Sequence, residues 1–334
     1  MTAVAARERW LRRARHGLEY AVLRALVDGL ARWPEPAAEA VAAALGRAMH
    51  SVFRVRRGIV HAQIAAAYPD APRAWVRRVA RASYVHFARE MVATAAFART
   101  WPDGLRARVE VVRLDDLRAA ARAGGAVIVT GHFGNWELSA SAVAAHGVPM
   151  YAVYQAQANP RVDAYVRRMR TALGLRLVRR GEVGPAARAI LREGGVLGFV
   201  ADQHARLRGL WVPFFGRPAS THRGPAHLAL RFGVPLFVGA MRRTGPGRRY
   251  RLEIEEVPTA DLRGARGGGP AASEPVAALT GRWVACLERM VRAAPEQYLW
   301  LHRRWKGRPA GTPGPEAGRT GDPRTAAREE VGGG

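Results

Sequence analysis

Hydrophobic positions in the first third of the chain repeat with the period of an α-helix. The segment 7–33 carries apolar residues at three- and four-residue intervals, which predicts an amphipathic helix. Two prolines end this pattern, and an alanine-rich helix is predicted over 37–53. A shorter helical segment, 58–67, and a long helix through Val76, Tyr84 and Met91 complete a region that we expect to be entirely helical.

Beyond residue 104, short apolar runs alternate with helical patterns. Strands are predicted at Arg108–Val112, Ala126–Thr130, Val148–Val153, Leu175–Val178, Gly195–Ala201, Leu236–Met241 and Tyr250–Val257. Helices are predicted at 114–123, 137–145, 160–173, 184–192, 227–232 and 276–293. This alternation is typical of an α/β fold with a largely parallel central sheet flanked by helices. The segment Val212–Pro225 is punctuated by glycine and proline and is left without a predicted strand.

The charge of the chain is unusual, although its hydrophobic content of 49% is ordinary for a globular protein. The net charge is +26, and Lys306 is the single lysine, so arginine supplies nearly all of it. Abundant Arg, Ala and Gly also fit a GC-rich genome, so part of this charge reflects codon use. The remainder favours anionic lipid headgroups, acidic carrier proteins or nucleic acid as partners.

Cysteine content and hydropathy narrow the classes further. Cys286 is the single cysteine, which excludes an intramolecular disulfide and a cysteine-rich metal site, and its helical surroundings indicate core packing. The first residues lack the apolar core of a signal peptide, and no transmembrane helix is predicted. Four histidines have no metal-like spacing, and we interpret them as packing or surface residues: His204, His222, His227 and His302.

The predicted N-terminal helix admits two interpretations. Arginines line it and Trp10 and Trp33 bracket it, a composition that suits a helix lying at a membrane interface. An ordinary surface helix packed on the domain explains the pattern equally well. We expect membrane-associating helices over 1–57, a catalytic domain over 58–308 and a disordered tail over 309–334.

The candidate chemistry lies in the stretch AVIVTGHFGNWEL, residues 126–138. A helix would place His132 and Glu137 about 140° apart, so they can meet only if His132 precedes the helix. Gly131 and Gly134 permit the sharp turn that this requires, and Asn135 is a candidate N-cap. Glu137 would then orient one imidazole nitrogen while the other takes a proton from a hydroxyl. Alternatively, His132 only hydrogen-bonds the turn and Glu137 caps the helix.

Several ordered blocks resemble one family of enzymes. HFGNWEL is similar to the active-site motif of the lipid A late acyltransferases (the lauroyl/myristoyl acyltransferase type), within the lysophospholipid-acyltransferase-like superfamily. Further blocks match in order from about residue 56 to 308: Asn159-Pro160 and the arginines after it, Ala201-Asp202-Gln203, Val212–Gly216, Gly233–Pro235 and Pro295–Lys306. Gln63 and Trp305 depart from the family pattern, where Asn and Phe are usual.

The resemblance implies a glycerol-3-phosphate acyltransferase-like fold and an acyl transfer from acyl carrier protein to a hydroxyl of a lipid A precursor. It implies His132 and Glu137 as the catalytic pair, without metal or redox cofactor, at the cytoplasmic face of the inner membrane. Asn135, Arg168, Arg170, Asp202, Gln203, Arg303 and Arg304 are the candidate substrate-binding residues. We favour Asp202 as a turn-capping residue or an ion-pair partner that orients the site, rather than as a catalytic group.

Two rival interpretations remain. A related acyltransferase could act on another membrane lipid, such as a phosphatidylinositol mannoside, with much the same motif around His132. A basic protein without catalytic activity could bind membrane or nucleic acid. That rival predicts arginines gathered in one stripe with interleaved aromatics, whereas here they are spread through the chain, and we expect no nucleic-acid partner.

Overall fold

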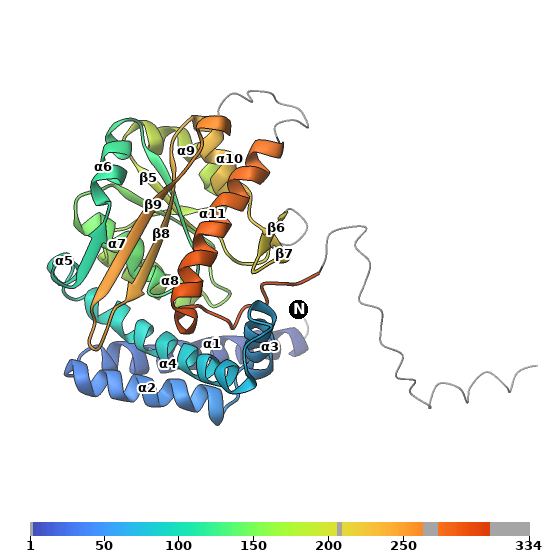
Figure 1. The fold of residues 1–334 in the computed structure, drawn as a ribbon. Helices are drawn as coiled ribbons and strands as arrows, with labels where there is room; N and C mark the ends of the chain where they lie inside the picture. The colour runs from blue at the N-terminus through green and yellow to red at the C-terminus, as the bar shows by residue number, and fades with distance from the viewer. Residues whose placement is uncertain (1–2, 206–208, 263–272, 308–334) are drawn as a thin grey trace, which may run out of the picture.

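The computed structural model describes residues 3–205, 209–262 and 273–307. Four helices gather below the lower ends of the strands of a central sheet (Figure 1): α1 (Ala3–Leu30), α2 (Glu35–Ser51), α3 (Arg57–Ala67) and α4 (Arg73–Phe97). α2 and α4 pack closely because α2 presents small residues. A Cβ on Gly46 would lie only 2.6 Å from the Tyr84 carbonyl oxygen on α4. The helical N-terminal third is therefore confirmed.

The main sheet has the strand order β1-β9-β8-β2-β5-β3-β4. Its strands are β1 (Val109–Val112), β2 (Ala126–Thr130), β3 (Met150–Tyr154), β4 (Arg176–Arg179), β5 (Val196–Val200), β8 (Leu236–Arg243) and β9 (Tyr250–Val257). The strands from β8 to β4 pair in parallel, whereas β9 returns antiparallel to β8 and carries β1 parallel to itself. The predicted α/β class with a largely parallel sheet is confirmed.

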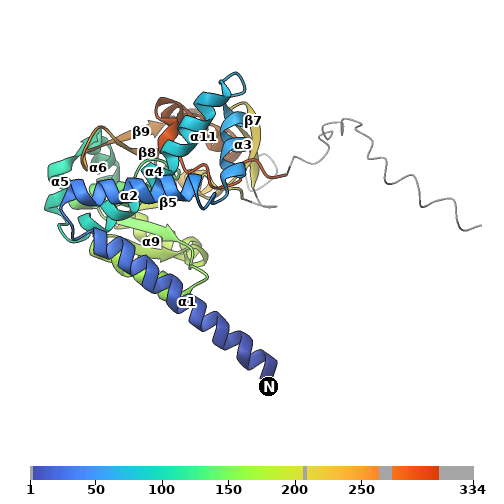
Figure 2. The ribbon, with the colours of Figure 1, turned by 90° about the horizontal axis from the view of Figure 1, so that it is seen from below.

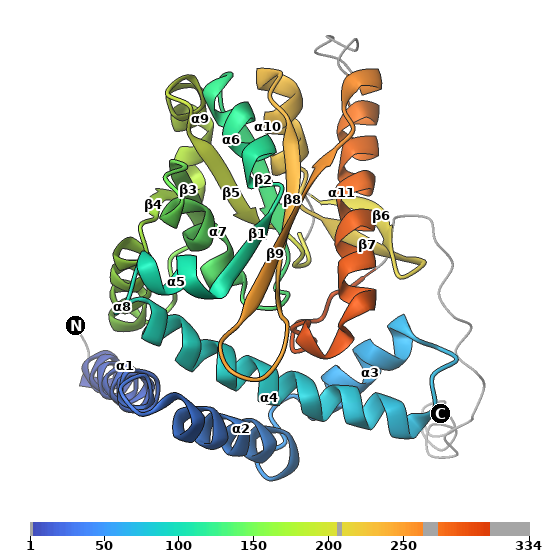
Figure 3. The same ribbon diagram turned by 60° about the vertical axis from the view of Figure 1, so that its left-hand side comes forward.

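Helices cover both faces of this sheet (Figure 3). They are α5 (Asp103–Arg108), α6 (Leu114–Arg122), α7 (Trp136–Ala145), α8 (Pro160–Ala172), α9 (Val183–Arg192), α10 (Gly224–Phe232) and α11 (Ser273–Ala293). Alternate residues of β2 serve the two faces: Val127 and Val129 join a core with α9, α10 and α11, while Ala126 and Ile128 join one with α6 and α7. Cys286 is buried in the α11 core, as expected.

A small antiparallel ribbon was not predicted. β6 (Leu210–Phe214) pairs with β7 (Arg217–Thr221), inside the segment interpreted as irregular. Pro213 and Pro218 stand opposite each other in this pairing. Proline cannot donate to a sheet ladder, so it disguises a strand pattern and is tolerated at edges such as this.

The N-terminal helix is the element least enclosed by the rest of the chain. α1 extends past the other helices (Figure 2), and Leu30 near its end packs with Ala38, Ala42 and Val92. Among the described residues, no helix combines the length and apolarity needed to cross a membrane. The predicted tail over 309–334 and most of the glycine-rich loop 259–274 lie outside the described residues.

Candidate active site

The turn between β2 and α7 needs its glycine and asparagine. Gly134 has a φ of +56°, and a Cβ there would lie 1.5 Å from the Met241 carbonyl oxygen on β8. Asn135 is the N-cap of α7, and its side-chain oxygen accepts the Leu138 N–H at 3.1 Å. His132 therefore precedes the helix and Glu137 lies in its first turn, as the spacing predicted.

The same turn is hydrogen-bonded on two sides. On one side, the Gly134 N–H donates to the Gln297 carbonyl at 2.9 Å and the Leu299 N–H donates to the His132 carbonyl at 2.9 Å. On the other side, the Asn135 N–H donates to the Met241 carbonyl at 3.1 Å. The C-terminal block 295–306 thus fixes the backbone that carries His132.

Asp202 is the carboxylate that contacts His132. The His132 Nδ1 lies 2.7 Å from Asp202 Oδ1, and the His132 backbone N–H donates to Asp202 Oδ2 at 2.9 Å. The Gln203 side-chain nitrogen lies 3.2 Å from His132 Nε2. The expected contact between Glu137 and the imidazole is therefore corrected, since Asp202 and Gln203 occupy the two ring nitrogens. Asp202 has the orienting position that we favoured for it.

Glu137 instead binds Arg170 from α8. Arg170 donates from Nε to one carboxylate oxygen at 2.8 Å and from Nη2 to the other at 2.6 Å. This two-point geometry matches the planar guanidinium to the planar carboxylate. Arg170 is therefore brought to the site as predicted, although its observed partner is Glu137.

The electrostatics favour charge on all of these groups. Burial alone would lower the pKa of His132, but Asp202 and, to a lesser degree, Glu137 raise it above the ordinary value. Burial opposes ionisation of Asp202 and Glu137, yet His132 and Arg170 respectively hold both carboxyl pKa values below their usual range. The site can stabilise an imidazolium beside two carboxylates.

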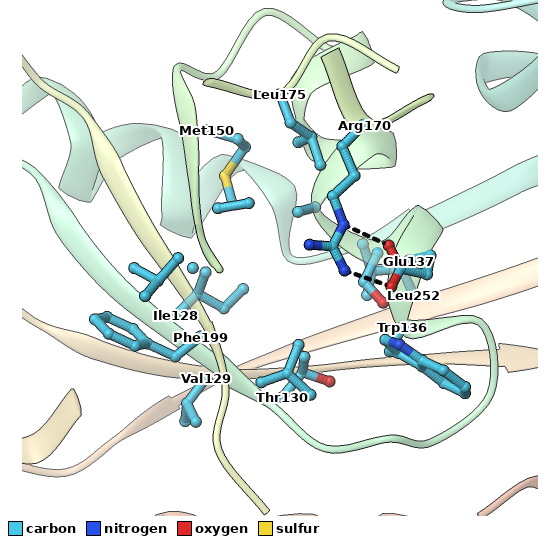
Figure 4. A pocket seen from close by; sticks show the side chains of 17 residues that line it. Ile128, Val129, Thr130, Trp136, Glu137, Met150, Arg170, Leu175, Phe199 and Leu252 are labelled. Atoms are coloured by element: carbon cyan, nitrogen blue, oxygen red, sulfur yellow. Dashed lines mark hydrogen bonds and ion pairs between the residues drawn. The ribbon is translucent and has the colours of Figure 1, made fainter. Parts of the chain in front are cut away.

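A narrow apolar cavity of about 60 Å³ adjoins this polar cluster. Figure 4 shows Glu137 and Arg170 at one side of it and aliphatic or aromatic side chains around the rest, including Ile128, Met150, Leu175 and Phe199. Trp136 also lines the cavity, and its ring centroid is 5.1 Å from that of His132. One end of an apolar chain in this cavity would lie beside Glu137 and Arg170, and Trp136 connects that part of the wall to the His132 ring.

Glu90 on α4 anchors the turn from below and was missed from the sequence. It is fully buried, and its carboxylate accepts from Asn135 Nδ2, Arg243 Nε and the Tyr250 hydroxyl, each at 2.7 Å. The available signal was a carboxylate on the otherwise core-facing side of the predicted long helix. Asn135 is 1% exposed and uses its amide within this cluster, so the structure gives it a capping position instead of a substrate contact.

The remaining predicted arginines do not converge on His132. Arg168 is exposed and lies beside Tyr20 of α1. Arg304 is 2% exposed, and its guanidinium donates to the Ser220 carbonyl at 2.7 Å and to the Thr221 hydroxyl. Arg303 is exposed. Of these three, Arg304 is a structural residue that helps to hold the end of β7. Asp202 is close enough to partly offset the effect of burial, which lowers the pKa of Arg304.

Comparisons with known proteins show the family of this chain. The chain is 28% identical to a lipid A biosynthesis lauroyltransferase of Escherichia coli over 287 residues, which cover 84% of this chain and 89% of the relative. It is 30% identical to a lipid A biosynthesis palmitoleoyltransferase of E. coli and to a lipid A biosynthesis acyltransferase of Shigella flexneri, in each case over 63% of this chain and 66% of the relative. A family model described as bacterial lipid A biosynthesis acyltransferase matches residues 6–307, and the chain belongs to that family.

Proposed function

We propose that this protein transfers a fatty acyl group from a thioester on acyl carrier protein to a hydroxyl of a lipid A precursor, with His132 as general base. One observation carries the proposal: Asp202 fixes Nδ1 of His132, and Trp136, whose ring neighbours that of His132, lines an apolar cavity. This pairs a proton acceptor with neighbouring apolar surface, two features that fatty acyl transfer requires.

The reaction follows from the ring geometry. Nδ1–H donates to Asp202, which leaves Nε2 unprotonated and able to take the proton of the acceptor hydroxyl. The hydroxyl oxygen attacks the thioester carbonyl carbon and forms a tetrahedral intermediate. Its collapse breaks the C–S bond, and the departing thiolate recovers the proton from Nε2. The products are an ester and a free thiol, so the reaction balances without a redox cofactor or metal.

Gln203 and Glu137 have supporting parts in this scheme. The Gln203 amide holds Nε2 at 3.2 Å, the place that the acceptor hydroxyl must take, so Gln203 has to yield when the acceptor binds. Glu137 raises the pKa of His132 through space and thereby supports the imidazolium. Arg170 fixes the Glu137 carboxylate at the edge of the cavity.

The surface of α1 supports a membrane location. Leu18, Val22 and Leu26 lie at four-residue intervals on one stripe and are 67%, 48% and 43% exposed. A helix that only packed on the domain would bury such a stripe, whereas an interfacial helix immerses it in lipid. We place the protein as a peripheral or monotopic enzyme at the cytoplasmic face of the inner membrane, where acyl carrier protein and a glycolipid acceptor can meet.

Replacement of His132 tests the chemistry directly. His132→Ala should abolish acyl transfer from acyl carrier protein to the lipid A precursor, followed by mass spectrometry of the product, and should leave the folded circular dichroism spectrum intact. His227→Asn is the matched control, because His227 is exposed on α10, and it should retain activity. Full activity of folded His132→Ala protein would overturn the proposal.

The acceptor is tested in cells. Mass spectrometry of lipid A from a deletion strain should show the loss of one secondary acyl chain, restored by the wild-type gene but not by the His132→Ala gene. Unchanged lipid A together with altered phospholipids or other glycolipids, such as phosphatidylinositol mannosides, would transfer the same chemistry to a different acceptor.

A further inference from the structure

A second cleft, about 740 Å³ in volume, opens between α2 and α4, away from the apolar cavity beside Glu137 and Arg170. Arg47 from α2 and Arg77, Arg78 and Arg81 from α4 line it. All four are exposed, and in the described part of the chain none has a carboxylate within 4.0 Å of its guanidinium nitrogens. Glu296 is the single acidic residue among the described residues that line the cleft. Its wall is therefore strongly cationic.

The pKa values of two histidines beside these arginines are lowered by burial and by the positive charge. His50 lines the cleft, and its Nε2 lies 3.1 Å from that of His61. Burial lowers the pKa of both rings. His61, Arg57 and Arg81 lower the pKa of His50 further, and Arg57 and Arg77 lower that of His61. An anion in the cleft would relieve the repulsion among these groups.

An apolar rim adjoins the cationic wall. Ser51 lines the cleft at the end of α2, and Val52 and Phe53, which follow it directly, are each 70% exposed. A soluble phosphate compound would gain no binding energy from exposed apolar side chains beside its phosphate group. A lipid does, because its headgroup presents a phosphate at the depth where neighbouring apolar residues enter the acyl region.

We propose that this cleft binds the phosphate groups of anionic membrane lipids while Val52 and Phe53 insert beside them. This site goes beyond the proposed reaction and lies apart from the acyl cavity. Its inner end is formed in part by His86 and Gln297, and Gln297 also accepts the Gly134 N–H of the catalytic turn. Lipid bound there would hold the carboxyl end of β2, which His132 follows, toward the membrane surface.

Vesicle co-sedimentation of the full chain tests the site without an activity measurement. The probes are phosphatidylcholine vesicles with and without phosphatidylglycerol. Arg77→Gln/Arg81→Gln should weaken binding to the anionic vesicles roughly thirtyfold, since each basic residue near such a surface contributes about 1 kcal/mol. Arg122→Gln/Arg192→Gln removes the same charge from exposed residues of α6 and α9 near the amino ends of β2 and β5, and should weaken binding less than about threefold.

Phe53→Ser tests the apolar rim and should weaken binding to the anionic vesicles by roughly tenfold, from the loss of Phe burial. Thermal unfolding of each variant should match that of the parent chain, because these side chains are exposed. Equal losses in the two double variants would attribute binding to net charge and overturn the site. Undiminished vesicle binding by Phe53→Ser would overturn a lipid occupant. So would an Arg77→Gln/Arg81→Gln variant that binds vesicles like the parent chain but loses binding to purified acyl carrier protein.

Discussion

The contributions of Asp202 and Glu137 to the reaction can be distinguished by replacing each carboxylate with the amide of the same shape. Asp202→Asn should lower kcat by roughly 10⁴-fold, the effect of replacing the carboxylate partner of a catalytic histidine, because the amide favours the wrong tautomer and cannot stabilise the imidazolium. Glu137→Gln should cost less, since Glu137 acts on His132 only through space. Steady-state rates at saturating donor and acceptor compare the two. A larger loss in Glu137→Gln would return the orienting part to Glu137.

The pH dependence of the rate provides a second test of the contact between His132 and Asp202. As the proposed general base, His132 must be neutral to accept a proton, so kcat/KM should rise with pH through the pKa of His132 in the free enzyme. Asp202 raises that pKa above 6.5, which places the midpoint of the acid limb above pH 6.5. In Asp202→Asn the midpoint should move to lower pH, because burial then acts with less opposition. An unmoved midpoint would show that a different group limits the rate at acid pH.

The identity of this partner depends on strand register, which sequence spacing does not contain. Thr130 on β2 pairs with Val200 on β5, so the residues two positions further, His132 and Asp202, emerge side by side. A prediction from the sequence could place both residues at strand ends, but it could not establish that these two strands are neighbours. Glu137, only five positions away, was therefore preferred as the contact.

The β2–α7 connection depends on one close backbone approach. Gly134→Ala would force a Cβ to within 1.5 Å of the Met241 carbonyl oxygen, and backbone on both sides is already hydrogen-bonded. We expect a loss of more than about 3 kcal/mol in the free energy of unfolding, measured with urea, and loss of activity. Gly147→Ala is the control: its φ of +83° is also positive, but nothing lies within 4 Å, so about 1–2 kcal/mol is expected. Equal losses would assign the effect to φ alone.

Glu90 connects α4 to the same turn through buried charge. Glu90→Leu would leave Arg243, whose side chain is 9% exposed, without its 2.7 Å partner. Breaking a buried ion pair in this way typically costs about 3–5 kcal/mol, and the remaining Glu39 contact at 3.2 Å favours the lower end. Glu110→Gln, which breaks the exposed Arg251 pair, should cost at most about 1 kcal/mol in the same urea titration. A small loss in Glu90→Leu would show that Glu39 alone compensates Arg243.

Elements with a clean apolar period were predictable, and those held by tertiary contacts were not. The strand prediction Ala126–Thr130 coincides with β2, and the predicted helix 160–173 differs from α8 by one residue. The β6–β7 ribbon escaped because Pro213 and Pro218 interrupt its pattern. The antiparallel return of β9 against β8 does have a local signal, since the short Gly-Pro-Gly link between Arg243 and Tyr250 cannot form the crossover of about a dozen residues that parallel strands need.

At the scale of the whole molecule, the four N-terminal helices lie at one end of the strands of the sheet (Figures 1 and 3). α1, α2, α3 and α4 lie next to the carboxyl ends of β2 and β5, where His132 and Asp202 emerge (Figures 1 and 3). An enzyme that takes a soluble donor and a membrane-embedded acceptor must bring its site to the lipid surface. We expect this end of the sheet to face the membrane.

The apolar stripe of α1 provides the last prediction. Leu18→Ser/Leu26→Ser should weaken binding to phosphatidylglycerol-containing vesicles by roughly 100-fold, since each leucine transferred into lipid contributes about 1.5 kcal/mol or more. Leu18→Met/Leu26→Met keeps the stripe apolar and should bind like the parent chain. Both leucines are largely exposed, so acyl transfer to a detergent-dispersed acceptor should be unchanged in either variant. Undiminished vesicle binding by the serine variant would make α1 an ordinary surface helix and leave membrane attachment to the α2–α4 cleft and its rim.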